Sequence, residues 1–225
     1  MNSSKANDID AAIQVSRTQR TPCVLVLDTS GSMMGDDRIG QLNRALKSFE
    51  ATIKKDGALR QQVVLSVIGF GSEVSILTDW VQADEFVAPV LVATGQTVLG
   101  QAMRRAHAAI EDLRAKLKTE GIAYTRPWIF LMSDGQPTDD DWKEAAEESR
   151  QRCESKRAAV WPFAVSGADA KALQSFARHD MDVYSLEGAD FDAIFRWLTT
   201  SLGAVASSTG THLQIAPPPL IRISV

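Results

Sequence analysis

The chain has 225 residues, of which 44% are hydrophobic and 23% are charged. This composition is ordinary for a packed globular protein and excludes a disordered or fibrous one. Lys and Arg total 24 against 28 Asp and Glu, and the net charge of -4 disfavours nucleic acid or an anionic membrane surface as a partner. The length suits one α/β domain with a single large core.

The first residues and the cysteines bear on the cellular compartment. Residues 1–20 lack the apolar segment of a secretory signal, and no later stretch approaches the roughly 18 apolar residues of a membrane span. Cys23 and Cys153 belong to no CxxC pair and to no run with metal-ligand spacing, so we expect two reduced, buried thiols. These features predict a cytoplasmic protein.

Four short apolar runs, at residues 23–27, 63–70, 128–132 and 158–165, are nearly continuous. Such runs are typical of strands that are buried on both faces. Residues 73–76 alternate polar and apolar after a glycine turn, which predicts a hairpin partner at one edge of the sheet, and residues 182–184 predict a short strand at the other edge. Pro162 lies inside the fourth run, so we expect a bulge or a strand end there.

Between these runs, apolar residues recur at steps of three and four, which predicts helices. The predicted helices cover residues 39–53, 99–117, 142–153, 170–178 and 191–202. Strands that alternate with helices predict a doubly wound α/β fold, with a mostly parallel sheet of six strands and helices on both faces. We expect an N-terminal extension over residues 1–20, a domain over 21–205 and a Pro/Ser/Thr-rich tail over 206–225, whose last six residues could add a strand.

The residues best suited to hold a ligand lie at strand ends. Asp28 ends the first predicted strand, and Ser30 and Ser32 follow it in the sequence DTSGS. Asp134 comes just after the run WIFLM, and Thr97 lies in the turn before the second predicted helix. In a doubly wound sheet, loops at the carboxyl ends of the strands face one crevice. We therefore expect two carboxylates and three hydroxyls to converge there.

These five groups are hard oxygen donors without His or Cys, which suits Mg²⁺ or Mn²⁺ and disfavours Zn²⁺ or Cu²⁺. Octahedral Mg²⁺ takes about six oxygen ligands, so five protein groups leave a place for an outside ligand. The two carboxylates balance the charge of the ion and the hydroxyls add none, so the ion still attracts an Asp or Glu of a partner. The expected function is protein binding through a cation-bridged carboxylate.

The five residues Asp28, Ser30, Ser32, Thr97 and Asp134 resemble the metal-ion-dependent adhesion site (MIDAS) of the von Willebrand factor type A (vWA) family. The pattern of that site is D-x-S-x-S, then a distant Thr and a distant Asp, and the resemblance covers about residues 20–205. It implies a Rossmann-like sheet with one antiparallel edge strand, and a cation above the sheet between the strands that end in Asp28 and Asp134.

The segments TGQTVLG (94–100) and LMSDGQPTDD (131–140) look like the bacterial, cytosolic vWA branch that includes the tellurite-resistance protein TerY. For this branch the resemblance implies a role in stress or tellurite resistance, often beside a protein kinase and a phosphatase of the metal-dependent Ser/Thr type. Such proteins are the expected partners, and this sequence contains neither catalytic domain.

Other interpretations stay open. The hydroxyls of Ser30 and Ser32 could cap a helix, although the five-residue match favours a metal. A metal-dependent phosphoesterase could use Asp28 and Asp134, but aspartyl phosphatases resemble D-x-D where this chain has Ser30, and no general acid is evident. A third function is a metal-free scaffold that binds through a helix face.

Several other polar residues are left out of the predicted site. Residues 139–141 are all Asp and are expected to start the next helix, where acidic side chains interact favourably with the helix dipole. His107, His179 and His212 are far apart in the sequence and form no visible set of nucleophile or ligands. We expect them to be ordinary packed or surface residues.

Overall fold

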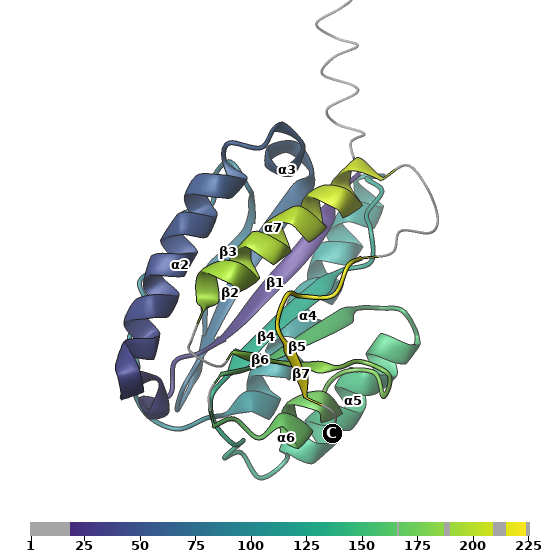
Figure 1. The fold of residues 1–225 in the computed structure, drawn as a ribbon. Coiled ribbons are helices and arrows are strands. Elements are labelled where there is room, and N and C mark those ends of the chain that lie inside the picture. The colour runs from purple at the N-terminus through teal and green to yellow at the C-terminus, as the bar shows by residue number, and fades with distance from the viewer. Residues whose placement is uncertain (1–18, 166, 187–189, 209–214, 224–225) are drawn as a thin grey trace, which may run out of the picture.

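The computed structural model of the chain describes residues 19–165, 167–186, 190–208 and 215–223 (Figure 1). Most of the expected N-terminal extension and part of the tail, including His212, lie outside the described residues. The strands are β1 (Thr21–Asp28), β2 (Val63–Phe70), β3 (Val74–Gln82), β4 (Trp128–Ser133), β5 (Ala159–Val165), β6 (Val183–Leu186) and β7 (Ile221–Ile223). The helices are the 3₁₀ helix η1 (Gly31–Asp37), α2 (Arg38–Ile53), α3 (Gly57–Gln62), α4 (Leu99–Thr119), α5 (Trp142–Glu154), α6 (Ala170–Ser175) and α7 (Phe191–Ser207).

The strands form one sheet in the order β3-β2-β1-β4-β5-β6-β7. The five central strands are parallel, and the antiparallel strands β3 and β7 lie at the two edges. The expected α/β fold is therefore confirmed, but the described sheet has seven strands where six were predicted. The additional strand, β7, pairs with β6 and replaces it at the edge. It has only three residues, all at least partly exposed, so it lacks the apolar run that identifies a buried strand.

Pro162 does not produce the expected bulge or strand end. β5 pairs with β4 in an unbroken parallel register from Ala159 to Ala164, with Pro162 opposite Leu131. The pairing of β5 with β6 begins only at Phe163. Since Pro162 has a strand partner on one side only, the sheet tolerates its missing N–H there.

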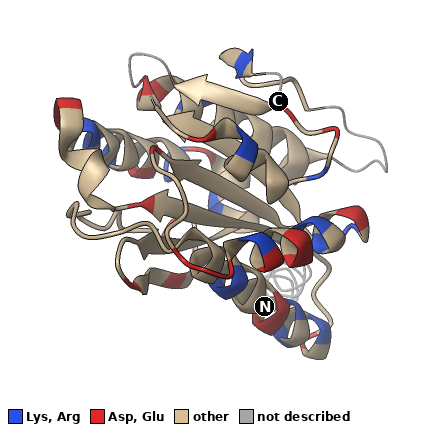
Figure 2. Cartoon of the chain, turned by 90° about the horizontal axis from the view of Figure 1, so that it is seen from below, with Lys and Arg blue, Asp and Glu red and all other residues tan. Residues whose placement is uncertain are grey.

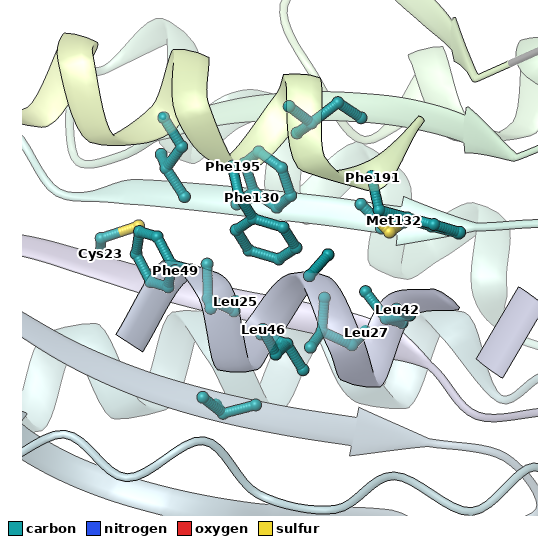
Figure 3. Close-up of a cluster of buried hydrophobic side chains, with 14 of the residues drawn as sticks. Cys23, Leu25, Leu27, Leu42, Leu46, Phe49, Phe130, Met132, Phe191 and Phe195 are labelled. Atoms are coloured by element: carbon teal, nitrogen blue, oxygen red, sulfur yellow. The ribbon is translucent and has the colours of Figure 1, made fainter. Parts of the chain in front are cut away.

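Helices cover both faces of the sheet, as Figure 1 shows. α2, α3 and α7 pack on one face, where Leu25 and Phe130 of the sheet meet Phe49 of α2 and Phe195 of α7 (Figure 3). α4, α5 and α6 cover the other face. Because residues of β1 alternate between the two cores, the strand is buried along its whole length, as its continuous apolar run predicted.

Charged side chains lie mainly on the helices and loops. Figure 2 shows Lys and Arg interspersed with Asp and Glu along the helices, while the ribbons of the strands carry little charge. No helix in the described residues is long and apolar enough to span a bilayer. Cys23 and Cys153 are buried and unpaired, as expected.

The chain after α7 returns to the sheet. The indole Nε1–H of Trp197 in α7 donates to the carbonyl oxygen of Ala216 at 2.8 Å, and Ile215 and Leu220 pack against the core beneath α7. The segment then enters β7, where Ile221 pairs with Ser185. The predicted strand at the end of the sequence thus forms, and its partner is this chain's own β6.

Candidate metal centre

The candidate site lies at the carboxyl ends of β1 and β4. β1 is at the centre of the parallel sheet, and the strands that follow it in the chain lie on both of its sides, with β2 on one side and β4 on the other. The crevice between β1 and β4 is thus a topological switch point, where ligands bind in open α/β sheets. Asp28 is the last residue of β1, and Asp134 follows the last residue of β4.

Hydrogen bonds link four of the five predicted ligands. The Oδ1 atom of Asp28 accepts from the backbone N–H of Ser30 at 2.7 Å. The hydroxyl oxygens of Ser30 and Ser32 are 2.9 Å apart, and the hydroxyl of Ser32 donates to Oδ1 of Asp134 at 2.5 Å. Asp28, Ser30 and Asp134 are buried while Ser32 is exposed, so the set opens to solvent at Ser32.

Thr97 stands outside this series of hydrogen bonds in the described part of the chain, but it lies beside the other groups. A Cβ atom placed on Gly135 would be 3.0 Å from the Thr97 hydroxyl oxygen and 3.8 Å from the Ser32 hydroxyl oxygen. The backbone N–H of Thr97 donates to the Thr138 hydroxyl at 3.1 Å, and the Thr97 carbonyl accepts from the Thr138 N–H at 2.9 Å. The glycine leaves open the space between two hydroxyls that the sequence predicted to share one ion.

Two residues that the sequence pattern did not identify also contact the carboxylates. The hydroxyl of Ser133 donates to Oδ2 of Asp28. The guanidinium of Arg38, the first residue of α2, donates from Nη1 to Oδ2 of Asp134 at 2.7 Å. Ser133 could have been recognised as the neighbour of Asp134, but nothing local marks Arg38, which is 96 positions away from its partner.

The environment of Asp28 disfavours an isolated negative charge. The pKa of Asp28 is raised to about 6, mainly by burial and to a smaller extent by the nearby Asp134 carboxylate, while hydrogen bonds from Ser133 and Ser30 oppose the rise. A cation beside both carboxylates would favour their charged forms. Residues of this chemistry therefore fit a divalent cation with a preference for oxygen ligands.

The described residues contain no group of three or more His, Cys, Asp or Glu side chains that could hold a metal. This is expected of a site with only two carboxylates, because its other donors are hydroxyls. His107 lies in the core, where its Nε2 atom is 2.9 Å from the Ser149 hydroxyl oxygen. It is a packed residue, as predicted.

Asp139 does not cap the helix that follows it, contrary to the expectation from the sequence. Its Oδ2 atom accepts from the backbone N–H of Gln101 at 2.9 Å, so this carboxylate caps the first turn of α4 and not the helix that follows it in sequence. Asp141 does lie directly before α5 and forms an ion pair with Arg104. The buried Oδ1 atom of Asp139 has no hydrogen-bond partner among the described residues.

An apolar groove adjoins the site. It has a volume of about 400 Å³ and includes Thr29, between Asp28 and Ser30, in its lining. Its lining also includes Gly69, Gly71, Leu77 and residues 90–92. Val90 is 82% exposed and Val92 is 70% exposed, so apolar side chains lie open to solvent beside the site.

The geometry defines an α/β domain with oxygen donors at the carboxyl edge of its sheet. A family model described as "von Willebrand factor type A domain" matches residues 23–136, which is half of the chain. The chain belongs to the von Willebrand factor type A domain family. No curated protein sequence matches it significantly.

Solved structures share the fold at low sequence identity. The pilus adhesin SpaC from Lactobacillus rhamnosus GG aligns with a TM-score of 0.66 and 17% identity over 83% of this chain and 31% of its own. The vWF domain of the type V pili tip protein Mfa5 from Porphyromonas gingivalis aligns with a TM-score of 0.61 and 12% identity. The alignment covers 87% of this chain and 99% of the Mfa5 domain. Proximal thread matrix protein 1 from the mussel byssus, solved with a zinc-occupied MIDAS motif, aligns with a TM-score of 0.57 and 14% identity. The alignment covers 82% of this chain and 48% of the mussel protein. This chain thus spans about half of the mussel protein.

Proposed function

We propose that this domain binds an acidic side chain of a protein partner through a divalent cation held by Asp28, Ser30, Ser32, Thr97 and Asp134. The observation that supports this most directly is the set of hydrogen bonds that joins Asp28 to the backbone N–H of Ser30, the Ser30 hydroxyl to the Ser32 hydroxyl, and the Ser32 hydroxyl to Asp134. It unites two segments 102 positions apart in the chain at the point of the sheet where ligands bind.

The donors favour Mg²⁺ or Mn²⁺ as the resident ion, because all are oxygen atoms. When bound, the ion would supply a positive charge that attracts a carboxylate of the partner. The chain's own residues orient the Asp28 carboxylate toward this site, since the Ser133 hydroxyl and the Ser30 N–H each donate a hydrogen bond to one of its oxygens. The exposed Ser32 lies on the side from which the partner approaches.

A protein is the proposed partner because apolar surface continues from the site. Val90 and Val92 border the groove and are largely exposed. An apolar surface beside a charged site is suited to a protein segment that carries an acidic residue next to apolar ones. A small hydrophilic anion would leave these valines in water.

The resemblance to the TerY branch extends the proposal to the biological system. On this basis the domain acts in the cytoplasm of a bacterium, in stress or tellurite resistance or in phospho-signalling, and its partner is a kinase or a metal-dependent phosphatase of the same system. The proposed binding domain spans residues 21–205, and the tail adds β7 to its sheet.

A thermal melt with increasing Mg²⁺ or Mn²⁺ tests the cation site first. A free cation concentration of about 100 times the dissociation constant stabilises the native state by roughly 2.7 kcal/mol, so the melting temperature should rise steadily with the logarithm of the cation concentration. Asp134→Asn removes a ligand charge and should abolish the rise. Asp140→Asn is the matched control, because Asp140 is exposed and should leave the rise unchanged.

Identical melts of all three proteins with and without cation would count against the cation site. A Zn²⁺ series belongs in the same experiment, since the mussel protein of this fold was solved with zinc at its motif. Stabilisation by zinc alone would overturn the proposed choice of ion but not the site. Glutamate added together with Mn²⁺ then tests whether the bound ion takes a carboxylate.

The alternative phosphoesterase function has its own test. Hydrolysis of p-nitrophenyl phosphate with Mg²⁺ should not exceed the rate without protein. Sustained turnover that disappears in Asp28→Ala would replace the binding function with an enzymatic one.

A further inference from the structure

Arg38 occupies a position that the sequence pattern of the site does not explain. Its guanidinium Nη1 lies 2.7 Å from Oδ2 of Asp134. The Asp134 side chain is fully buried and that of Arg38 is 17% exposed, so little water screens this ion pair. A positive charge of the protein itself is therefore already bound to one of the two carboxylates that are proposed to hold the cation.

Neighbouring groups fix both partners of the ion pair between Arg38 and Asp134. Residues 36 and 37, both Asp, have left-handed backbone angles, with φ of 51° and 55°, and this turn starts α2 with Arg38 directed at Asp134. The other carboxylate oxygen, Oδ1 of Asp134, accepts from the Ser32 hydroxyl at 2.5 Å. Hence one oxygen of Asp134 faces the serine hydroxyls and the other faces the guanidinium. Asp36 is 3.6 Å from Arg38 but 88% exposed, so it offsets little of the Arg38 charge.

We propose that Arg38 sets the affinity of the site by competing with the divalent cation for Asp134, so that cation and acidic ligand bind cooperatively. This inference rests on the proposed function. A cation at the serine hydroxyls and the guanidinium share one carboxylate, and their positive charges repel each other at short range in a partly desolvated place. The domain alone then binds the cation weakly.

An arriving carboxylate changes this balance. Its negative charge is attracted by the cation and by Arg38 together, so it offsets the repulsion between them. By linkage, a ligand that binds more tightly when the cation is present also tightens the binding of the cation. Arg38 therefore makes the site selective for an acidic partner plus cation over the cation alone.

The test measures the Mn²⁺ dissociation constant by calorimetry for wild type and Arg38→Gln. Gln keeps an N–H donor for Asp134 but removes the charge, so Mn²⁺ should bind about tenfold more tightly or better. Arg44→Gln is the matched control, because Arg44 lies on the same helix with 67% of its side chain exposed, and it should stay within about threefold of wild type. Arg38→Lys keeps the charge and should also stay near wild type.

Equal or weaker Mn²⁺ binding by Arg38→Gln, in a protein shown to be folded by circular dichroism, would overturn the role of Arg38. A second experiment compares Mn²⁺ binding by wild type in two salts, so its result does not depend on whether a variant folds. At equal ionic strength, and with affinities calculated from the free Mn²⁺ concentration, Mn²⁺ should bind more tightly in sodium acetate than in sodium chloride. Equal affinity in the two salts would contradict cooperativity. If neither wild type nor Arg38→Gln binds Mn²⁺, the proposed cation site itself fails. That result differs from binding that is insensitive to Arg38.

Discussion

At the scale of single residues, Gly135 decides whether two hydroxyls can share an ion. A Cβ at this position would lie 3.0 Å from the Thr97 hydroxyl oxygen and 3.8 Å from that of Ser32. The first distance is tighter than ordinary van der Waals contact, so Thr97 would have to shift. The absent side chain is thus part of the candidate site, although glycine has no donor atom of its own.

Gly135→Ala is therefore expected to weaken Mn²⁺ binding while it leaves the fold intact, because the methyl group enters the space between the hydroxyls. The affinity is measured by calorimetry, and the melting temperature is measured in the presence of a chelator. Gly57→Ala is the control, because nothing lies within 4 Å of its added Cβ. Unchanged Mn²⁺ affinity in Gly135→Ala would show that the ion does not use this space.

The sequence could predict that the five candidate residues lie near one another, because each lies at a strand end or a helix start; their role as ligands stays a prediction. Four of them are joined by hydrogen bonds as a convergent site requires, and Thr97 lies beside them. The pattern could not predict Arg38, since a contact over 96 positions depends on how α2 leaves its preceding turn. It also misplaced Asp139, because a capping residue need not belong to the nearest helix in sequence.

At the scale of elements, the segment that carries Thr97 is held by its neighbours. Residues 86–98 form neither helix nor strand, yet the side chain of Asn43 in α2 donates to the Leu91 carbonyl at 2.9 Å and accepts from the Leu91 N–H at 2.8 Å. The backbone N–H of Thr94 donates to the Thr29 carbonyl at 2.7 Å. The segment therefore connects α2 to the loop that follows β1.

Asn43→Ala should lower the free energy of unfolding by about 1–3 kcal/mol, because it leaves the N–H and the carbonyl of Leu91 without their side-chain partner. Urea denaturation measures the loss. Gln41→Ala removes an exposed bond to the Asp36 carbonyl and should change stability by no more than about 0.5 kcal/mol. Equal losses in the two variants would contradict a specific role for Asn43.

Elements with a strong apolar pattern were predictable, and short polar ones were not. β1, β2, β4 and β5 form where the continuous runs placed them, because both of their faces are buried. α3 has six residues and a single buried one, Leu59, which is too few for a helical period to show. A strand at the end of the sequence was expected, but its pairing with the edge of β6 is a tertiary contact that the three residues of β7 do not specify.

At the scale of the whole molecule, the two faces of the sheet have separate cores, and one contains a buried titratable group. His107 of α4 meets Ser149 of α5, whose hydroxyl donates to the Phe176 carbonyl at 2.6 Å. Burial lowers the pKa of His107 to about 4, with a smaller contribution from the charge of Arg152 and an opposing one from Glu111. The packing of α4 against α5 thus requires the neutral imidazole.

The unfolded chain binds a proton at His107 below pH 6.5 while the native state does not until about pH 4, so stability falls as the pH drops through this window. The shift corresponds to a loss on the order of 3 kcal/mol by pH 4. Urea denaturation at pH 8 to 4 should show a steeper decline for wild type than for His107→Gln, which cannot titrate. Parallel pH profiles of the two proteins would contradict this assignment.

The direction of β7 bears on how the domain can be displayed. Because β7 runs antiparallel to β6, Ile223 lies opposite Val183, at the amino end of β6. Thr21 likewise begins β1 at its amino end, while Asp28 and Asp134 lie at the carboxyl ends. A linker fused before Thr21 would therefore leave from the side remote from the ligand crevice. Ile223 lies closer to the crevice, because β6 is short and pairs with the carboxyl-terminal half of β5. Tethering the domain through its amino end should thus keep the crevice facing outward.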